Sequence, residues 1–483
     1  MNDGASLDPL DWSALREQGH RMLDDMFDHL QGLRDQPVWR QPPDALRQGF
    51  REPLPAEPTP VEDLHARFLA EVLPYAGGNL HPGFLGWVQG GGTAVGMLAE
   101  MLSGGLNANL GGRDHMPIEV ERQIVGWCRE LFRFPEDAGG LLVSGASQAN
   151  FIGVLVARQR ALGPQVRRKG IGGDVRLTAY ASQAAHGCIP RAMEMAGLGR
   201  EALRLIPVNA RHEIDLAELR AAIARDRQDG CTPFLIVGAA GTVDTGAIDD
   251  LEALTDLARA EGLHLHVDGA FGALGMLSEA IAPRLAGIER ADSLAFDFHK
   301  WAQVPYDAGF ILVRDPQLHR DTFAAEASYL ARDNRGLAGG EWWPCDYGPE
   351  LSRGFRALKT WFTLKAYGTR ALGAMIDHCC LLTQALALRV EQEAELELLA
   401  PVALNVVCFR YRCDDAEAVN RSLVADLHEQ GLVAPSLTRI RGRTAIRAAI
   451  VNHRTTTADI ETLVRSVVQL GRTAAPQRRS DHA

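Results

Sequence analysis

The sequence predicts an α/β protein built around one large, mostly parallel sheet. Between residues 76 and 365, short apolar runs alternate with helical stretches, which is typical of strands and helices taking turns in a parallel sheet. Residues 366–483 change to a smaller α+β order, and residues 1–75 contain a helix followed by an extended segment. We therefore expect three regions: an N-terminal helical arm, a large α/β domain and a small C-terminal α+β domain.

The arm begins with an amphipathic helix over residues 11–34. Its apolar side chains recur at multiples of three to four residues, at Leu15, Met22, Met26 and Leu30. Residues 35–63 are rich in proline and charge, which excludes a long helix or a central strand there. Because this helix has no partner nearby in the sequence, we expect it to dock on a second subunit.

The large domain contains six predicted strands, several of them followed by helical stretches. The strands are GLLV (140–143), VRLTAYAS (175–182), FLIVGAAG (234–241), LHLHVD (263–268), SLAFDF (293–298) and AGFILVRD (308–315). In such sheets ligands bind outside the carboxyl ends of the strands, so the loops that follow these runs are the expected site.

Composition and charge limit the kinds of partner. The chain has 483 residues, is 46% apolar and carries a formal charge of −11, with its arginines scattered singly. This argues against binding to nucleic acid or an anionic membrane and favours a small molecule. No apolar run approaches the ~18 residues that span a bilayer, and the N-terminus lacks the apolar core of a signal peptide. The eight cysteines form no CxxC pair, so we expect reduced thiols and a cytoplasmic protein.

Lys300 is unusual because lysine is rare in this chain. Of 50 basic residues only four are lysines, at positions 169, 300, 359 and 365, so lysine does not serve as the general surface charge. Lys300 ends the alternating run SLAFDFHK. Behind aromatic and apolar neighbours its amine should be partly desolvated, which lowers its pKa and makes it a nucleophile.

The motif SGASQAN, Ser144–Asn150, lies between a predicted strand and a helix. Its small residues let backbone N–H groups approach an anion, and a helix N-terminus adds partial positive charge, so a phosphate could bind here. Simple helix capping by the same residues is the alternative.

The motif LHLHVDGAFGA, Leu263–Ala273, places His264, His266 and Asp268 on one face of a strand. A metal site is one interpretation, although no HExxH, CxxC or DxD partner motif accompanies it. A second is a buried acid that caps the next turn. A third is an acid that keeps a heterocyclic ring nitrogen protonated.

His186, in YASQAAHGCIPRAM, follows a strand and precedes a helix. A single loop histidine can be merely solvated, but together the four motifs supply an amine, an acid, a ring and a phosphate seat. These are the requirements of pyridoxal phosphate. A dinucleotide or nucleoside triphosphate is disfavoured, because no GxGxxG follows a strand and no GxxxxGK[ST] occurs.

These motifs resemble the group II pyridoxal-phosphate-dependent amino-acid decarboxylases, from HPGFLGW at His81 to IRAAIVNHRTT at residues 446–456. The resemblance implies the fold of PLP-dependent transferases (fold type I) and a homodimer with shared active sites. In DFHKW it implies a Schiff-base lysine, Lys300, with His299 contacting the cofactor. In HVDGAF it implies that Asp268 meets the pyridine nitrogen and that Ala270 lies beneath the ring.

The resemblance assigns the remaining cofactor contacts as well. His186 is expected to stack on the ring, and Thr242 matches the family's GTT-like run, although Val243 replaces the second threonine. Three small residues are expected to hold the phosphate: Ala146, Ser147 and Ser293.

The implied reaction is decarboxylation of an L-amino acid through an external aldimine, with protonation at Cα to give an amine. In the aromatic-substrate members the usual proton donor is a tyrosine upstream of the segment that appears here as SRGFRALK. Aligning from Ser352 backward places Pro344 at that position; Tyr347 is the nearest candidate and His186 the next.

Four hypotheses follow. The first is an L-amino-acid decarboxylase. The second is an oxygen-consuming aldehyde synthase, because a member without the proton donor can divert the carbanion to oxygen. A cofactor-binding relative without chemistry and a metal-dependent hydrolase that uses His264, His266 and Asp268 are the others.

Overall fold

A computed structural model describes residues 6–173, 175–325 and 332–480, of which the last six are described only as backbone. The large domain is built on a seven-stranded sheet in the order β2-β8-β7-β6-β5-β3-β4. Its strands are β2 (Gly139–Val143), β3 (Leu177–Ser182), β4 (Leu203–Ile206), β5 (Thr232–Ala239), β6 (His264–Asp268), β7 (Ser293–Asp297) and β8 (Gly309–Val313).

The sheet is mostly parallel, as predicted. Only β8 runs antiparallel to its neighbours β2 and β7, while β4, β3, β5, β6 and β7 are parallel. Strand β8 (GFILV) is buried along its whole length, which explains its continuous apolar sequence. Strands β6 and β7 are equally buried although they carry His264, His266, Asp268, Ser293 and Asp297. Strand β4 was not among the predicted strands; it is short and its central residues are partly exposed at the sheet edge.

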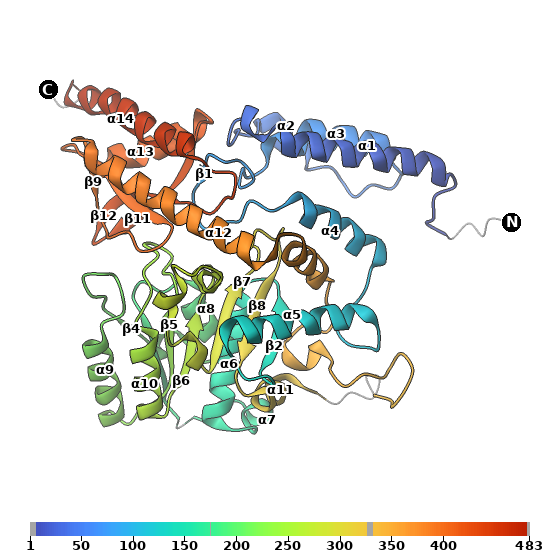
Figure 1. Cartoon of the computed structure of the whole chain (residues 1–483), viewed down its shortest axis with the longest axis vertical. Coiled ribbons are helices and arrows are strands. Elements are labelled where there is room, and N and C mark those ends of the chain that lie inside the picture. Colours follow the sequence, from blue (N-terminus) through green and yellow to red (C-terminus); the bar gives the residue numbers. More distant parts are fainter. Residues whose placement is uncertain (1–5, 174, 326–331, 481–483) are drawn as a thin grey trace.

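Helices cover both faces of this sheet (Figure 1). On one face α6 (Ala146–Leu162) and α8 (Cys188–Met195) pack against β3, β5, β7 and β8. The other face holds α5 (Met116–Phe132), α9 (Leu216–Gln228) and α10 (Leu251–Glu261). Helix α11 (Pro316–Phe323) follows β8.

The small domain has a five-stranded sheet in the order β1-β11-β12-β10-β9. Its strands are β9 (Leu396–Leu398), β10 (Val406–Tyr411), β11 (Ala434–Ile440), β12 (Arg443–Ala449) and the short β1 (Phe84–Leu85). Helices α13 (Ala416–Glu429) and α14 (Thr457–Ser480) complete it. Strand β1 comes from far earlier in the chain and runs parallel to β11, so residues next to it are brought to the junction of the two domains.

Helix α12 (Arg356–Gln392) joins the two domains and contains the predicted boundary at residues 365/366. It is kinked at Gly368, whose φ of 71° favours glycine. By length and composition α12 is apolar enough to cross a membrane. Its apolar side chains pack into the cores of both domains, with Ile376 in the large one and Leu386 in the small one, which accounts for this composition.

The arm contains α1 (Trp12–Gln31), α2 (Asp44–Gly49) and α3 (Val61–Arg67) and lies along the top of Figure 1, above α4 (Ala94–Leu106). Helix α1 confirms the predicted amphipathic helix, and Asp11 caps its N-terminus by accepting from the N–H groups of Ser13 and Ala14. The arm is tied to the small domain through the N–H of Val38, which donates to the carbonyl of Gly431 at 2.9 Å.

Candidate active site

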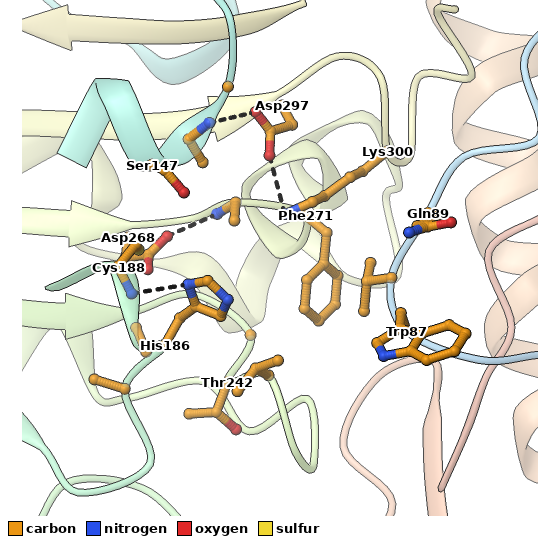
Figure 2. A pocket seen from close by; sticks show the side chains of 18 of the residues that line it. Trp87, Gln89, Ser147, His186, Cys188, Thr242, Asp268, Phe271, Asp297 and Lys300 are labelled. Carbon is orange, nitrogen blue, oxygen red and sulfur yellow. Dashed lines mark hydrogen bonds and ion pairs between the residues drawn. The ribbon is translucent and has the colours of Figure 1, made fainter. Parts of the chain in front are cut away.

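A cavity of about 500 Å³ lies at the carboxyl ends of β5, β6 and β7, where the architecture predicts a ligand site (Figure 2). The loop after β3, the N-terminus of α6 and the segment after β1 complete its wall. Eight of the ten residues that the sequence assigned to the site line this cavity: Ala146, Ser147, His186, Thr242, Asp268, Ala270, His299 and Lys300.

Lys300 is held by an acid that the sequence analysis missed. Its Nζ lies 2.9 Å from Oδ2 of Asp297, and the lysine side chain is 20% exposed. The other oxygen of Asp297 accepts a hydrogen bond from the N–H of Ala146 at 2.6 Å. Lys300 is therefore paired with a carboxylate and is not surrounded by apolar groups alone. The available signal was an acid three residues before the lysine in DFHK.

His299, beside the lysine, is oriented by its backbone surroundings. Its Nδ1 accepts from the N–H of Ala308 at 3.0 Å, so the ring proton lies on Nε2, 3.6 Å from Asp297. Burial lowers the pKa of His299, so the imidazole is favoured in its neutral form. The ring of Tyr306 packs against it with centroids 4.2 Å apart.

Asp268 ends β6 and points into the cavity (Figure 2). Burial raises the pKa of its carboxyl. Four groups act against that effect: the Lys300 ammonium, the nearby His186 ring, a hydrogen bond from Asn150 and another from the N–H of Ala270 at 3.2 Å. This arrangement suits an acid that must hold a positive ring nitrogen.

His186 lies next to Asp268 on the cavity wall (Figure 2). Its Nδ1 accepts from the N–H of Cys188 at 3.2 Å, which leaves a proton on Nε2. Thr242 lines the cavity beyond it, and its hydroxyl oxygen lies 3.0 Å from that of Thr245. The histidine is thus a fixed ring at the edge of the site.

The predicted phosphate seat is at the N-terminus of α6, where Ala146 and Ser147 line the cavity. The Ser147 hydroxyl points inward in Figure 2. The N–H of Ala146 is already engaged by Asp297, so the exposed Ser147 and the helix N-terminus are the groups that remain for an anion.

The prediction that Ser293 holds the phosphate is corrected by its position. Ser293 is 0% exposed and does not line the cavity. It begins β7, whereas the cavity lies at the other end of that strand. Its hydroxyl contacts Nε2 of His264 at 2.8 Å and Nδ1 of His266 at 2.7 Å.

The prediction that Tyr347 is the proton donor finds no support within the single chain and stays a prediction. Tyr347 ends the short turn Pro344–Tyr347 and is absent from the cavity wall. Its ring packs against His319 with centroids 5.1 Å apart, and its carbonyl lies 2.8 Å from Nε2 of that histidine. Within the single chain, this loop does not bring Tyr347 to the cavity.

The metal interpretation of β6 receives no support from the described residues. Among them, no group of three or more His, Cys, Asp or Glu side chains is placed to hold a metal ion. His264 and His266 are both buried, and burial lowers the pKa of His264 to about 4 and of His266 to about 3. Both histidine rings contact the hydroxyl of Ser293 and not a shared metal site.

Several cavity residues were not predicted, and they are of two kinds. Phe271 and Tyr306 follow β6 and β7 closely, and their motifs gave no reason to assign them to the wall. Trp87 and Gln89 follow β1 and lie across the cavity from Asp268 (Figure 2). Arg447, on β12, is 3% exposed and donates to the carbonyl of Val243 at 2.5 Å. Nothing in the local pattern around β1 and β12 indicates a wall shared with the large sheet, because only the docking of the two domains creates it.

The fold and the site together define an enzyme of PLP-dependent fold type I. The cavity combines a lysine amine, a buried acid, a histidine ring and a helix N-terminus, which fit the imine, the pyridine nitrogen, the ring face and the phosphate of pyridoxal phosphate. Residues 43–412 match the model of the pyridoxal-dependent decarboxylase conserved domain. The chain therefore belongs to the pyridoxal-dependent decarboxylases, and its cofactor is pyridoxal phosphate.

Known relatives agree over nearly the whole length. An aromatic-L-amino-acid decarboxylase of Bacillus atrophaeus is 32% identical over 92% of this chain and 93% of its own. A phenylacetaldehyde synthase of Arabidopsis thaliana is 27% identical over 92% and 94%. A crystal structure of Oryza sativa TDC with PLP and tryptamine superposes with a TM-score of 0.89 at 22% identity, covering 97% of this chain and 100% of that one. The last comparison shows the shared fold.

Proposed function

We propose that this decarboxylase removes the carboxylate of an aromatic L-amino acid as CO₂ and releases the corresponding amine. The observation that carries the proposal is the convergence of Lys300, Asp268 and His186 on one cavity. The relative from Bacillus atrophaeus, named for this substrate class, supports the choice of substrate. The aromatic rings of Trp87 and Phe271 on the wall offer apolar faces for an aromatic side chain.

In this proposal each of the main site residues has one role. Pyridoxal phosphate, when bound, supplies the electron sink for the pair released when a bond at Cα breaks. Lys300 would hold the cofactor, and Asp297 would pair with the lysine amine when that amine is free. Asp268 would hold the proton on the ring nitrogen, and His186 would stack on the ring. Ser147 and the N-terminus of α6 would hold the phosphate.

The substrate and product test uses the holoenzyme with L-tryptophan, L-tyrosine, L-phenylalanine and, for contrast, L-glutamate. We expect CO₂ and amine in equal amounts from at least one aromatic substrate. A higher kcat/KM for glutamate would contradict the substrate class. Lys300→Ala should abolish the visible absorption of the lysine-bound cofactor, whereas Lys365→Ala, an exposed lysine on α12, should keep it.

A second candidate function is the oxygen-dependent conversion of the amino acid to an aldehyde. Two observations favour it: the similarity to the phenylacetaldehyde synthase and the absence of Tyr347 from the cavity wall. In that reaction O₂ is consumed, and ammonia and hydrogen peroxide accompany the aldehyde and CO₂. Measurement of O₂ and ammonia in the same assay separates the two functions, because decarboxylation alone changes neither.

We also propose that the enzyme is a homodimer in the cytoplasm. Apolar side chains on the arm are exposed in the single chain: Leu10, Trp12, Leu15, Met22 and Leu64. Exposed apolar patches of this kind favour a protein partner. The eight cysteines are all unpaired, which suits a reducing compartment.

A further inference from the structure

Behind the cavity, a line of buried polar groups leads from β7 to Asp268. The hydroxyl of Ser293 lies 2.8 Å from Nε2 of His264 and 2.7 Å from Nδ1 of His266. Nε2 of His266 lies 2.7 Å from Oδ1 of Asn150, on α6. The exposed fraction of these four residues is 0–2%. The cofactor contacts described above use none of them.

With Oδ1 of Asn150 facing His266, as in the structure, one arrangement of protons satisfies these contacts. Oδ1 of Asn150 can only accept, so His266 carries its proton on Nε2. Burial keeps this imidazole neutral, since it lowers the pKa of His266 to about 3, and Nδ1 must therefore accept from the Ser293 hydroxyl. Ser293 then accepts from Nε2 of His264, whose Nδ1 has no hydrogen-bond partner among the described residues.

This proton order holds the Asn150 amide with its NH₂ end toward the site. With its oxygen held by His266, Asn150 presents its NH₂ group to Cys188, at 3.3 Å, and to Asp268. The hydrogen bond from Asn150 lowers the pKa of the Asp268 carboxyl, against the effect of burial. A reversed amide would place its oxygen against the carboxylate, and two acceptors would then face each other.

Helix α6 is shaped to admit the His266 ring. A Cβ on Gly153 would lie 2.5 Å from Cε1 and Nδ1 of His266, so only glycine leaves room at this position. Gly153 and Asn150 are three residues apart on one face of α6. Gly153 makes space for the imidazole, and Oδ1 of Asn150 accepts a hydrogen bond from its Nε2–H. Burying these polar groups costs free energy that an apolar strand would avoid.

We propose that His266 is a positioning residue which, through Asn150, holds an amide N–H against Asp268 and keeps that carboxylate ionised beside the ring nitrogen of the cofactor. The inference rests on the role proposed for Asp268. It adds to that role a reason why β6 carries a histidine two residues before the acid, on the same face of the strand.

The test measures the protonation state of the cofactor's ring nitrogen, using pyridoxal phosphate labelled with ¹⁵N at that atom. His266→Phe and Asn150→Leu remove the orienting group and the amide, respectively. In both we expect the ¹⁵N shift to move toward the unprotonated value. We also expect the dissociation constant of pyridoxal phosphate to rise about tenfold, as for the loss of one hydrogen bond to a charged group.

A matched control is His319→Phe. His319 is also 0% exposed, and burial lowers its pKa to about 4. Its ring packs against Gly139, where an added Cβ would lie 2.4 Å from Nδ1 of His319. It contacts the carbonyl of Tyr347 and not the cavity. We expect His319→Phe to leave both the ¹⁵N shift and the dissociation constant unchanged.

Two results separate the failure of this inference from the failure of the assignment beneath it. If Asp268→Asn keeps a protonated ring nitrogen, the role of Asp268 is wrong. If Asp268→Asn loses the proton while folded His266→Phe and Asn150→Leu keep it, only the inference is overturned.

The wild-type enzyme gives a test that does not depend on a variant folding. Its histidine ¹⁵N spectrum should show His266 protonated at Nε2 and bare at Nδ1. The opposite tautomer would overturn the proposal.

Discussion

At the residue scale, Ser293 and Asp297 show what a strand pattern can and cannot predict. Both lie on the same face of β7, because side chains alternate with a period of two. They are four residues apart, so at about 3.3 Å per residue the two ends of the strand are separated by about 13 Å. Only Asp297, at the carboxyl end, reaches Lys300. The motif led to Lys300, which lines the cavity, whereas the assignment of Ser293 to the phosphate chose the wrong end of the strand.

Substitution of single tyrosines tests which of them, if any, is the proton donor. Six of the seven tyrosines lie in the described residues, and among those six only Tyr306 lines the cavity. We expect Tyr347→Phe to keep amine formation within about twofold of wild type, because its ring packs on His319 away from the site. General acid catalysis contributes at least about a hundredfold, so a true proton donor would show a far larger loss.

Two further variants complete that comparison, with amine, aldehyde and ammonia measured in each. Tyr306→Phe removes the phenol on the cavity wall, and undiminished amine formation would exclude it as the donor. Tyr329→Phe makes the same change outside the described residues. A hundredfold loss in Tyr347→Phe would contradict the position that the structure gives Tyr347.

At the scale of elements, β5 and β8 could be predicted because burial on both faces leaves a continuous apolar run, and β6 and β7 because apolar residues recur at every second position. Strand β4 was not predicted, because its partly exposed position at the sheet edge gives a weak pattern of apolar residues. Strand β1 was not predicted, because two residues are too few to show a periodic pattern and its partner β11 lies about 350 positions later. Trp87 and Arg447 were missed for the same reason, since pairing between segments far apart in the sequence leaves no mark in a local window.

Helix α6 provides a paired prediction on glycine. In Gly153→Ala the new Cβ would lie 2.5 Å from the His266 ring, so we expect the free energy of unfolding to fall by about 1–3 kcal/mol through overpacking. Gly126→Ala, in α5, meets nothing within 4 Å and should raise it by about 0.5–1 kcal/mol through helix propensity. Denaturant unfolding of both apoenzymes measures the difference. Equal effects would show that the His266 ring is not confined by α6.

At the scale of the whole molecule, the single chain leaves apolar surface that its own fold does not cover. The arm contacts the small domain near Val38 but leaves Leu10 and Trp12 exposed. Helix α4, beneath the arm in Figure 1, exposes Met101 and Leu102 by 54% and 48%. Both surfaces belong to elements that precede the large sheet, which suggests a continuous interface between two copies.

The dimer prediction follows from that surface. Met101→Glu combined with Leu102→Glu places two charges on the exposed face of α4, where a buried interface would have to desolvate them. We expect light scattering to show a dimer for wild type and a monomer for this variant at the same micromolar concentration. Leu205→Glu, on the edge strand β4 and 58% exposed, is the matched control and should remain dimeric. A dimer that survives the α4 charges would place the interface elsewhere. If the active sites are shared, the monomeric variant should also lose decarboxylation while keeping its fold.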